Sequence, residues 1–144
     1  MRTLREQQSA LIMGQPAAKQ GDQITAIDTH IVMVPSGPVT VPTPLPHPFA
    51  GIINGNLSSD VNIMGMPAAT VDSTADNTPP HIPTPPGTAF QSPPANKGTI
   101  KIGSPTVKIN GKQAARNGDI AETCNDPADL QIGQVIAVGT VFIG

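Results

Sequence analysis

The chain has 144 residues, a formal net charge of −2, 12% charged residues, and no Trp or Tyr. One domain usually takes on the order of 100–200 residues, so a second catalytic domain does not fit. With no basic stripe and only three Phe as aromatic residues on which bases could stack, a nucleic-acid partner is not expected. Ile and Val far outnumber Leu, and branching at Cβ favours strands over helices, so the composition predicts an all-β protein.

Residues 1–11 are predicted to be an N-terminal extension ahead of the domain. They lack the apolar h-region of a signal peptide, and no run in the chain reaches the roughly 18 apolar residues of a membrane span. We therefore expect a protein that is made in the cytoplasm and is not exported by the general route. The single cysteine, Cys124, excludes an internal disulfide and leaves this thiol either inert or a metal ligand.

Residues 12–144 are predicted to form one domain with three imperfect repeats, near 12–22, 61–73 and 107–119. Each copy has the pattern Ile-x-Gly-x-x-Ala-Ala, and such repetition indicates a repeated structural unit. A short strand, a tight turn at the x-Gly step and a second short strand would make each copy a β-hairpin. The motif residues are Pro16, Ala17, Ala18, Gly21 and Asp22 in the first copy, Pro67, Ala68 and Ala69 in the second, and Ala114, Ala115, Arg116, Gly118 and Asp119 in the third.

Two details of the repeats bear on their geometry. Paired alanines at equivalent positions would let three hairpins approach one another closely. The middle copy has Asp72-Ser73 where the others have Gly-Asp; if that glycine position requires a positive φ, Asp is among the few residues that tolerate it. The type I′ turn signal Asn-Gly occurs at Asn110-Gly111 and, outside the motif, at Asn54-Gly55.

Thirteen of the 17 prolines lie in two segments, 35–48 and 79–94. Proline fixes φ and favours extended backbone, so these segments are predicted to be two long, stiff loops between strands. They are long enough to build a taller apex or a surface on which an effector docks, and the sequence does not choose between these roles.

The candidate metal ligands are the chain's three histidines and its cysteine: His30, His47, His81 and Cys124. His30 and His81 each lie eight residues after the residue in the motif Asp position, and Cys124 lies five residues after it. If the repeats are related by a threefold axis, these three side chains converge on it. His47 would complete the set from the first proline-rich segment. Three His and one Cys suit a single structural Zn²⁺ with four protein ligands.

The segments 16–22 and 113–119 resemble the Pro-Ala-Ala-Arg motif that names the PAAR family. The resemblance extends from Ile12 to the C-terminus, with four departures: Lys19 and Thr70 replace the motif Arg, Gln113 replaces the motif Pro, and the middle copy lacks Gly-Asp. It implies a small, non-enzymatic, pseudo-threefold cone of short strands and hairpins with long proline-rich loops. It also implies one zinc ion near the apex, held by three His and one Cys.

The resemblance further implies a partner. The broad base of the cone is expected to cap a trimeric spike of the valine-glycine-repeat or phage-tail type, with one tip per trimer, because a single chain with three similar faces matches three identical partner surfaces. The machine would be a type VI secretion system, an extracellular injection particle or a phage tail. The tip would be delivered outside the cell or into the target, contacting the target membrane transiently. The strand-like residues 135–144 are expected to close the cone, so any effector would be a separate protein.

Two other functions are weighed against the spike tip. If His47 were not a ligand, three protein ligands could hold a reactive water, with Asp28 or Glu122 as the base of a small zinc hydrolase. No His-Glu-x-x-His, Gly-x-Ser-x-Gly, P-loop or Cys-x-x-Cys motif supports an enzyme. The second alternative is a free-standing β-repeat binding module that has no spike beneath it.

Overall fold

The computed structural model describes residues 14–144, and within them the only regular secondary structure is β, which confirms the all-β prediction. The N-terminal extension and the start of the first repeat, Ile12 and Met13, lie outside the described residues. The strands are β1 (Gln15–Pro16), β2 (Gln23–Ser36), β3 (Val39–Gly55), β4 (Asn62–Ile63), β5 (Met66–Pro67), β6 (Thr74–Asn77), β7 (Ala89–Phe90), β8 (Lys97–Ile100), β9 (Lys108–Ile109), β10 (Lys112–Gln113), β11 (Ile120–Thr123), β12 (Leu130–Ile136) and β13 (Phe142–Ile143).

Six of these strands form a closed ring. The hydrogen-bonded order is β12-β11-β8-β6-β3-β2, and β12 also pairs with β2, which closes the sheet. The side chains that point inward alternate along each strand with exposed ones, as on any pleated sheet. They form one apolar core that is narrow because all of its members except Phe49 are small or β-branched. Its buried residues are Ala18, Ile24, Phe49, Ile53, Ala69, Ala75, Ile100, Ala115, Ala121, Cys124, Val135 and Ala137.

The paired alanines of the three repeats are joined by a closed ring of backbone hydrogen bonds. The Ala18 N–H donates to the Ala115 carbonyl (2.9 Å), the Ala115 N–H to the Ala69 carbonyl (3.0 Å), and the Ala69 N–H to the Ala18 carbonyl (3.0 Å). All three residues are completely buried. The pseudo-threefold arrangement expected from the repeats is thus present, and a methyl is the largest side chain that such close backbones accommodate.

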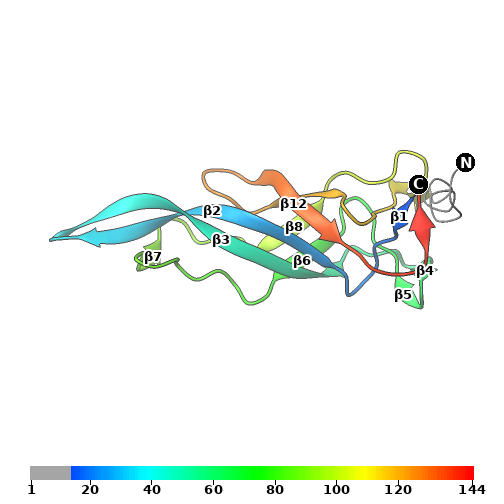
Figure 1. Ribbon diagram of the computed structural model, residues 1–144, viewed down its shortest axis with the longest axis horizontal. Coiled ribbons are helices and arrows are strands. Elements are labelled where there is room, and N and C mark those ends of the chain that lie inside the picture. The colour runs from blue at the N-terminus through cyan, green and yellow to red at the C-terminus, as the bar shows by residue number, and fades with distance from the viewer. Residues whose placement is uncertain (1–13) are drawn as a thin grey trace, which may run out of the picture.

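Three short hairpins form the end of the molecule at which β1, β4, β5 and the C-terminus lie (Figure 1). Two are the expected local hairpins, β4–β5 and β9–β10. The third is assembled from distant segments, because β1 pairs with β13 at the C-terminus. The prediction that repeat one forms its own hairpin is therefore wrong. Val141-Phe142-Ile143 takes the place of the Val-x-Ile strand that precedes the other two motifs.

Backbone angles test the turn predictions. Asp72 has φ +78°, close to the values of +94° for Gly21 and +86° for Gly118, which confirms that the middle repeat keeps a left-handed turn. Asn110 and Gly111 have φ of +53° and +79°, as a type I′ turn requires. The second Asn-Gly pair, at 54–55, is not a hairpin turn, since β3 continues through Gly55 with a register shift between residues 53 and 55.

Each of the three turns is also held by a side chain from the motif Asp position. Asp119 accepts hydrogen bonds from the Arg116 backbone N–H (2.7 Å) and guanidinium (2.8 Å). Asp22 does the same for the backbone and side chain of Lys19, so Lys replaces the motif Arg without loss of the ion pair. In the middle copy an uncharged equivalent appears, because the Ser73 hydroxyl accepts from the Thr70 backbone N–H (3.0 Å).

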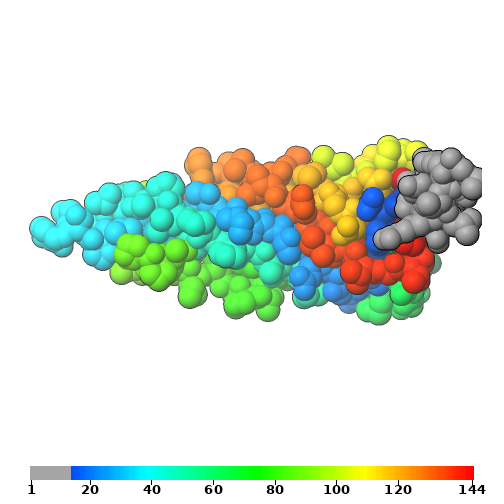
Figure 2. Space-filling view, viewed as in Figure 1, coloured from blue at the N-terminus to red at the C-terminus, as the bar shows by residue number. Residues whose placement is uncertain are grey.

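The first proline-rich segment is not a loop, which corrects that part of the sequence prediction. Residues 35–48 lie in a long hairpin in which β2 and β3 pair without interruption from Gln23–Ile52 to Ser36–Val39. The second segment, 79–94, is largely irregular and contains β7, which pairs with β2. The molecule is elongated: the β2–β3 hairpin tapers to one end, opposite the end that carries β1 and the C-terminus (Figures 1 and 2).

Within residues 14–144, no helix is long and apolar enough to cross a membrane.

Replacing Ala69 by Leu should destabilise the protein by about 1–3 kcal/mol or more, because the ring of alanine backbones leaves no space for a larger side chain. Denaturant unfolding monitored by circular dichroism measures this effect. The control is Ala95→Leu, which adds the same atoms at an exposed position. Equal stability of the two variants would contradict a close-packed axis.

Candidate metal centre

A cluster of polar side chains lies directly beyond the apolar core, inside the closed sheet. Asp28 and His30 are two residues apart on β2 and therefore point to the same, inward face. His81 comes from the irregular segment after β6, and Cys124 follows the last residue of β11. The segments that follow the three repeats thus bring these side chains to one place. The ring of Phe49 lies 6.1 Å from that of His81, on the core side.

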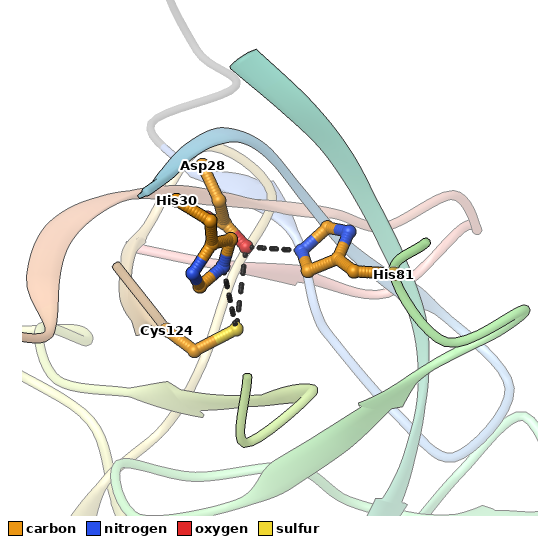
Figure 3. A group of neighbouring side chains, drawn as sticks. All are labelled: Asp28, His30, His81 and Cys124. Atoms are coloured by element: carbon orange, nitrogen blue, oxygen red, sulfur yellow. Dashed lines mark hydrogen bonds and ion pairs between the residues drawn. The ribbon is translucent and has the colours of Figure 1, made fainter. Parts of the chain in front are cut away.

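The four side chains are close enough to share one ion (Figure 3). One ligand atom from each of Asp28, His30, His81 and Cys124 lies within 4.8 Å of the others. The His81 Nε2 is 2.8 Å from the Asp28 Oδ2. The Cys124 Sγ is 3.4 Å from that same oxygen and 3.6 Å from the His30 Nε2. The expected convergence of His30, His81 and Cys124 is present, and a carboxylate joins them.

Asp28 is the residue that sequence reasoning did not assign as a ligand. Its carboxylate is completely buried and contacts the Thr123 hydroxyl (2.5 Å) and the Asn125 amide (3.4 Å) besides His81 and Cys124. Among the described ion pairs none joins Asp28 to a Lys or Arg. A buried carboxylate with only such partners is costly, and a bound cation would compensate its charge. The Asp-x-His spacing on one strand was the available signal.

The His30 ring has one nitrogen toward the cluster and one without a hydrogen-bond partner. Its Nε2 faces the Cys124 sulfur, whereas its buried Nδ1 has no partner that meets hydrogen-bond geometry. The nearest carboxylate to Nδ1 is Asp126, at 3.4 Å. This carboxylate is held in place by the Ile31 backbone N–H (2.9 Å). Asp126 is therefore the candidate outer partner that orients the His30 ring.

His47 lies beside the cluster but is engaged elsewhere. It pairs with Asp28 across β2 and β3, and its ring centroid is 5.4 Å from that of His30 and 5.5 Å from that of His81. Its Nδ1 is 2.8 Å from the carbonyl oxygen of Leu45, and its Nε2 accepts from the Thr84 backbone N–H (3.1 Å). Burial lowers the pKa of His47, and the neighbouring histidines lower it further. Its assignment as a ligand stays a prediction.

Cys124 is held as a neutral thiol when no metal is bound. Burial raises the pKa of this thiol to about 11, and the Asp28 carboxylate adds to the rise. Only the thiolate is a good metal ligand or nucleophile. A cation in the cluster would therefore be needed to stabilise the ionised sulfur at neutral pH.

Glu122, the other base considered for a hydrolase, does not belong to the cluster. It lies between Ala121 and Thr123 on β11, and both of those residues are completely buried on the inner face. Because side chains alternate along a strand, Glu122 points to the opposite face.

The fold and the cluster together define a class of protein: a pseudo-threefold β cone that holds a buried cluster of metal-binding side chains, to which all three repeats contribute. The model of the PAAR motif family matches residues 36–128, more than half of the chain. The chain belongs to the PAAR motif family, and the resemblance seen in its repeats is confirmed. No curated protein matches it. Membership of this family supports a structural role as a spike-tip protein of contractile injection systems.

Alkylation of Cys124 should be slow in the folded, chelator-treated protein at pH 8, because a thiol with a pKa of about 11 is ionised to about one part in a thousand at that pH. Reaction with iodoacetamide followed by mass spectrometry gives the rate. The urea-unfolded chain is the control and should react more than about tenfold faster. Equal rates would show that the fold neither shields the thiol nor raises its pKa.

Proposed function

We propose that this protein caps and sharpens the trimeric spike of a contractile injection machine, with one tip per trimer. The observation that carries the proposal is the hydrogen-bonded ring of Ala18, Ala69 and Ala115, which arranges three similar hairpins around one axis. A homotrimer offers three identical surfaces around its own axis, and a partner with three related faces can contact all of them. The end that carries these hairpins is the candidate base.

The candidate base has the exposed apolar side chains that an interface needs. Met64 of the β4–β5 turn and Phe142 of β13 are each about half exposed, at 53% and 49%. The third hairpin presents Lys108 and Lys112 instead. The short strands at this end also have edges with few backbone partners, and covering strand edges on both proteins is a recognised benefit of β-rich interfaces.

We further propose that the cluster binds one structural Zn²⁺. Imidazole nitrogen, thiolate sulfur and carboxylate oxygen are the ligands that zinc takes in proteins, at about 2.0–2.3 Å. A tetrahedral site with such bonds has ligand-to-ligand distances of about 3.3–3.7 Å. The separations of the Cys124 sulfur from Asp28 and from His30, 3.4 and 3.6 Å, already fall in this range.

His30, His81 and Cys124 are proposed as three of the ligands, and the fourth position has two candidates. The sequence predicts His47. The structure favours Asp28, because both ring nitrogens of His47 have backbone partners, whereas the Asp28 carboxylate lies 3.4 Å from the Cys124 sulfur. A carboxylate and a thiolate also neutralise the two charges of Zn²⁺ within a buried site.

The role of the metal follows from where the cluster lies. It lies between the narrow apolar core and the outer part of the β2–β3 hairpin, where the protein buries little apolar area. Small scaffolds commonly add a metal or disulfides in this situation. Structural zinc contributes on the order of 10–16 kcal/mol of apparent binding free energy in small domains, and folding uses this energy because the unfolded chain has no preformed site.

Cys124→Ser should reduce bound zinc to well below one equivalent and lower the melting temperature by about 10 °C or more, because loss of several kcal/mol shifts the transition by a few degrees per kcal/mol. Metal analysis of the purified protein and thermal unfolding measure the two effects. Full zinc occupancy in this variant would remove Cys124 from the site.

Asp28→Asn and His47→Gln form a matched pair that identifies the fourth ligand. Asp28→Asn should weaken zinc binding by about 10–100-fold or more, because loss of even an outer partner of a ligand typically costs that much, and His47→Gln by much less. Competition with a chromophoric chelator gives the affinities, and the visible bands of the Co²⁺-substituted protein report whether the site keeps four ligands. The reverse order would restore His47 as the fourth ligand.

A zinc hydrolase is the second candidate, and one observation favours testing it. A pocket of about 390 Å³, lined mainly by residues 77–85, reaches His47 and His81 from the surface, so a water could approach the cluster. Four protein ligands in the Co²⁺ spectrum would speak against this function, since catalytic zinc keeps an open position. Turnover of ester or amide substrates by the zinc-loaded protein would support it.

The spike proposal predicts a complex of one chain with three spike chains when the protein is co-expressed with a trimeric spike protein. Phe142→Asp should weaken this complex about tenfold or more, because it places a charge in an apolar interface. Val39→Asp, at the opposite end of the molecule, is the matched control and should bind normally. Light scattering coupled to size exclusion gives the stoichiometry. Absence of any complex would favour the free-standing binding module.

Effector proteins, passage through a target membrane and delivery outside the cell remain parts of this proposal that depend on the same complex.

A further inference from the structure

The β2–β3 hairpin extends beyond the metal centre as an arm, defined here as residues 31–46. The chain has no Asp, Glu, Lys or Arg between residues 29 and 59, so the arm has no charge. Val39 and Val41 near its end are 59% and 46% exposed. An exposed, uncharged hairpin rich in β-branched residues is the kind of segment that adds strands from other molecules when its edges are free.

The hydrogen-bond directions of β3 show which residues face its outer edge. The Ile53 N–H donates to Asp22, on the β2 side. The Ala50 N–H donates to the Asn77 side chain, on the opposite side. Backbone groups alternate sides along a strand, and the pairing of β2 with β3 has no irregularity from residue 39 to residue 52. At every even-numbered position of β3 in the arm, the backbone N–H and C=O groups therefore face away from β2.

Four successive outward-facing positions on β3 are proline: Pro42, Pro44, Pro46 and Pro48. We call them the proline edge. Because all four prolines are at even positions, the odd positions keep all their hydrogen bonds with β2. Proline has no N–H, so these even positions offer carbonyl acceptors to a neighbouring strand but no donors. One acceptor is used, since the Pro46 carbonyl accepts from the Thr84 hydroxyl (2.7 Å). Within residues 14–144, β3 pairs with a strand on this side only from Gly51 onward.

The other edge of the arm is closed in a different way. On β2, the Ile31 N–H donates to the Asp126 carboxylate (2.9 Å) and its carbonyl accepts from the Gln91 N–H (2.9 Å). The Met33 carbonyl accepts from the Thr88 N–H (2.9 Å). In the described part of the chain, only the β3 edge is left without a covering segment near Pro42 and Pro44. Charged side chains, the usual protection of an exposed edge, are missing there.

We propose that the proline edge keeps the arm from pairing with the arm of a second copy of this chain. The even spacing of the prolines removes the outward N–H groups at four successive positions, 42 to 48, that an added strand would need, and it leaves the internal hairpin intact. This inference does not depend on the spike or on zinc. It assigns to the first proline-rich segment a function that composition alone does not reveal, which is to allow an uncharged, apolar hairpin to stay exposed and unpaired.

Pro42→Thr with Pro44→Thr tests the proposal, because Thr restores two outward N–H groups and suits a strand. A net hydrogen bond changes an equilibrium by about fivefold. Two paired arms gain two donors each, so self-association should tighten by about thirtyfold if two of the four new bonds form and by about 600-fold if all four form, relative to the parent chain. Sedimentation velocity over a range of concentrations measures this, with circular dichroism confirming the fold. A double variant that stays as monomeric as the parent overturns the proposal.

Two further variants separate edge pairing from other causes. Pro42→Lys with Pro44→Lys restores the same donors but adds charge, so it should stay monomeric. Pro93→Thr changes an exposed proline outside the strands and should also stay monomeric; association of this variant to the same extent would overturn the proposal.

If the double Thr variant folds poorly, Pro44→Thr alone suffices. The backbone amide that this substitution introduces should gain protection from hydrogen exchange only at concentrations where the chain associates. Unchanged exchange in an associated sample would again refute pairing at this edge.

Discussion

The closed ring of hydrogen bonds among Ala18, Ala69 and Ala115 is the constraint on which the rest of the structure depends. It brings three backbones to one axis at a distance that only small side chains permit. From there each repeat continues through a left-handed turn into an inward-facing strand. Because the three turns are equivalent, the strands that follow them run along the core in the same register. Side chains at similar sequence distances beyond the turns therefore lie at the same level of the molecule.

The candidate metal centre is a consequence of that register. His30 and His81 follow their turns by the same number of residues, and Cys124 reaches the cluster from a shorter path. The counting that singled out His30 and His81 needed only a correct repeat alignment, whereas Cys124 was a candidate as the single cysteine of the chain. Asp28 could not be identified as a candidate ligand in the same way, because acidic residues are common in any sequence. Its burial beside the Cys124 thiol becomes evident only when β2 and β11 are brought together in the fold.

The parts that sequence reasoning missed share a physical cause: they depend on pairing between segments that are far apart in the chain. Repetition of a local pattern predicts a local hairpin, yet the first repeat pairs with Phe142–Ile143. The Val-x-Ile pattern at residues 141–143 was visible but lacked the Gly-x-x-Ala-Ala that follows its two equivalents. The arm was missed for a related reason. Proline generally indicates the end of a strand, whereas prolines at every second position are compatible with an edge strand whose donors all face the partner.

A single chain with three repeats reconciles two demands that a homotrimer could not meet together. A threefold base needs three similar hairpins, and these are supplied by near-identical motifs. A metal centre on the axis of a true homotrimer would receive the same side chain three times, and any arm would also occur in three copies. Because the repeats here are joined covalently, each can diverge beyond its turn: one provides His and Asp and continues into the arm, one provides His, and one provides Cys. The symmetry is kept where the hairpins pack and is lost where the chemistry of one site and one exposed hairpin requires it.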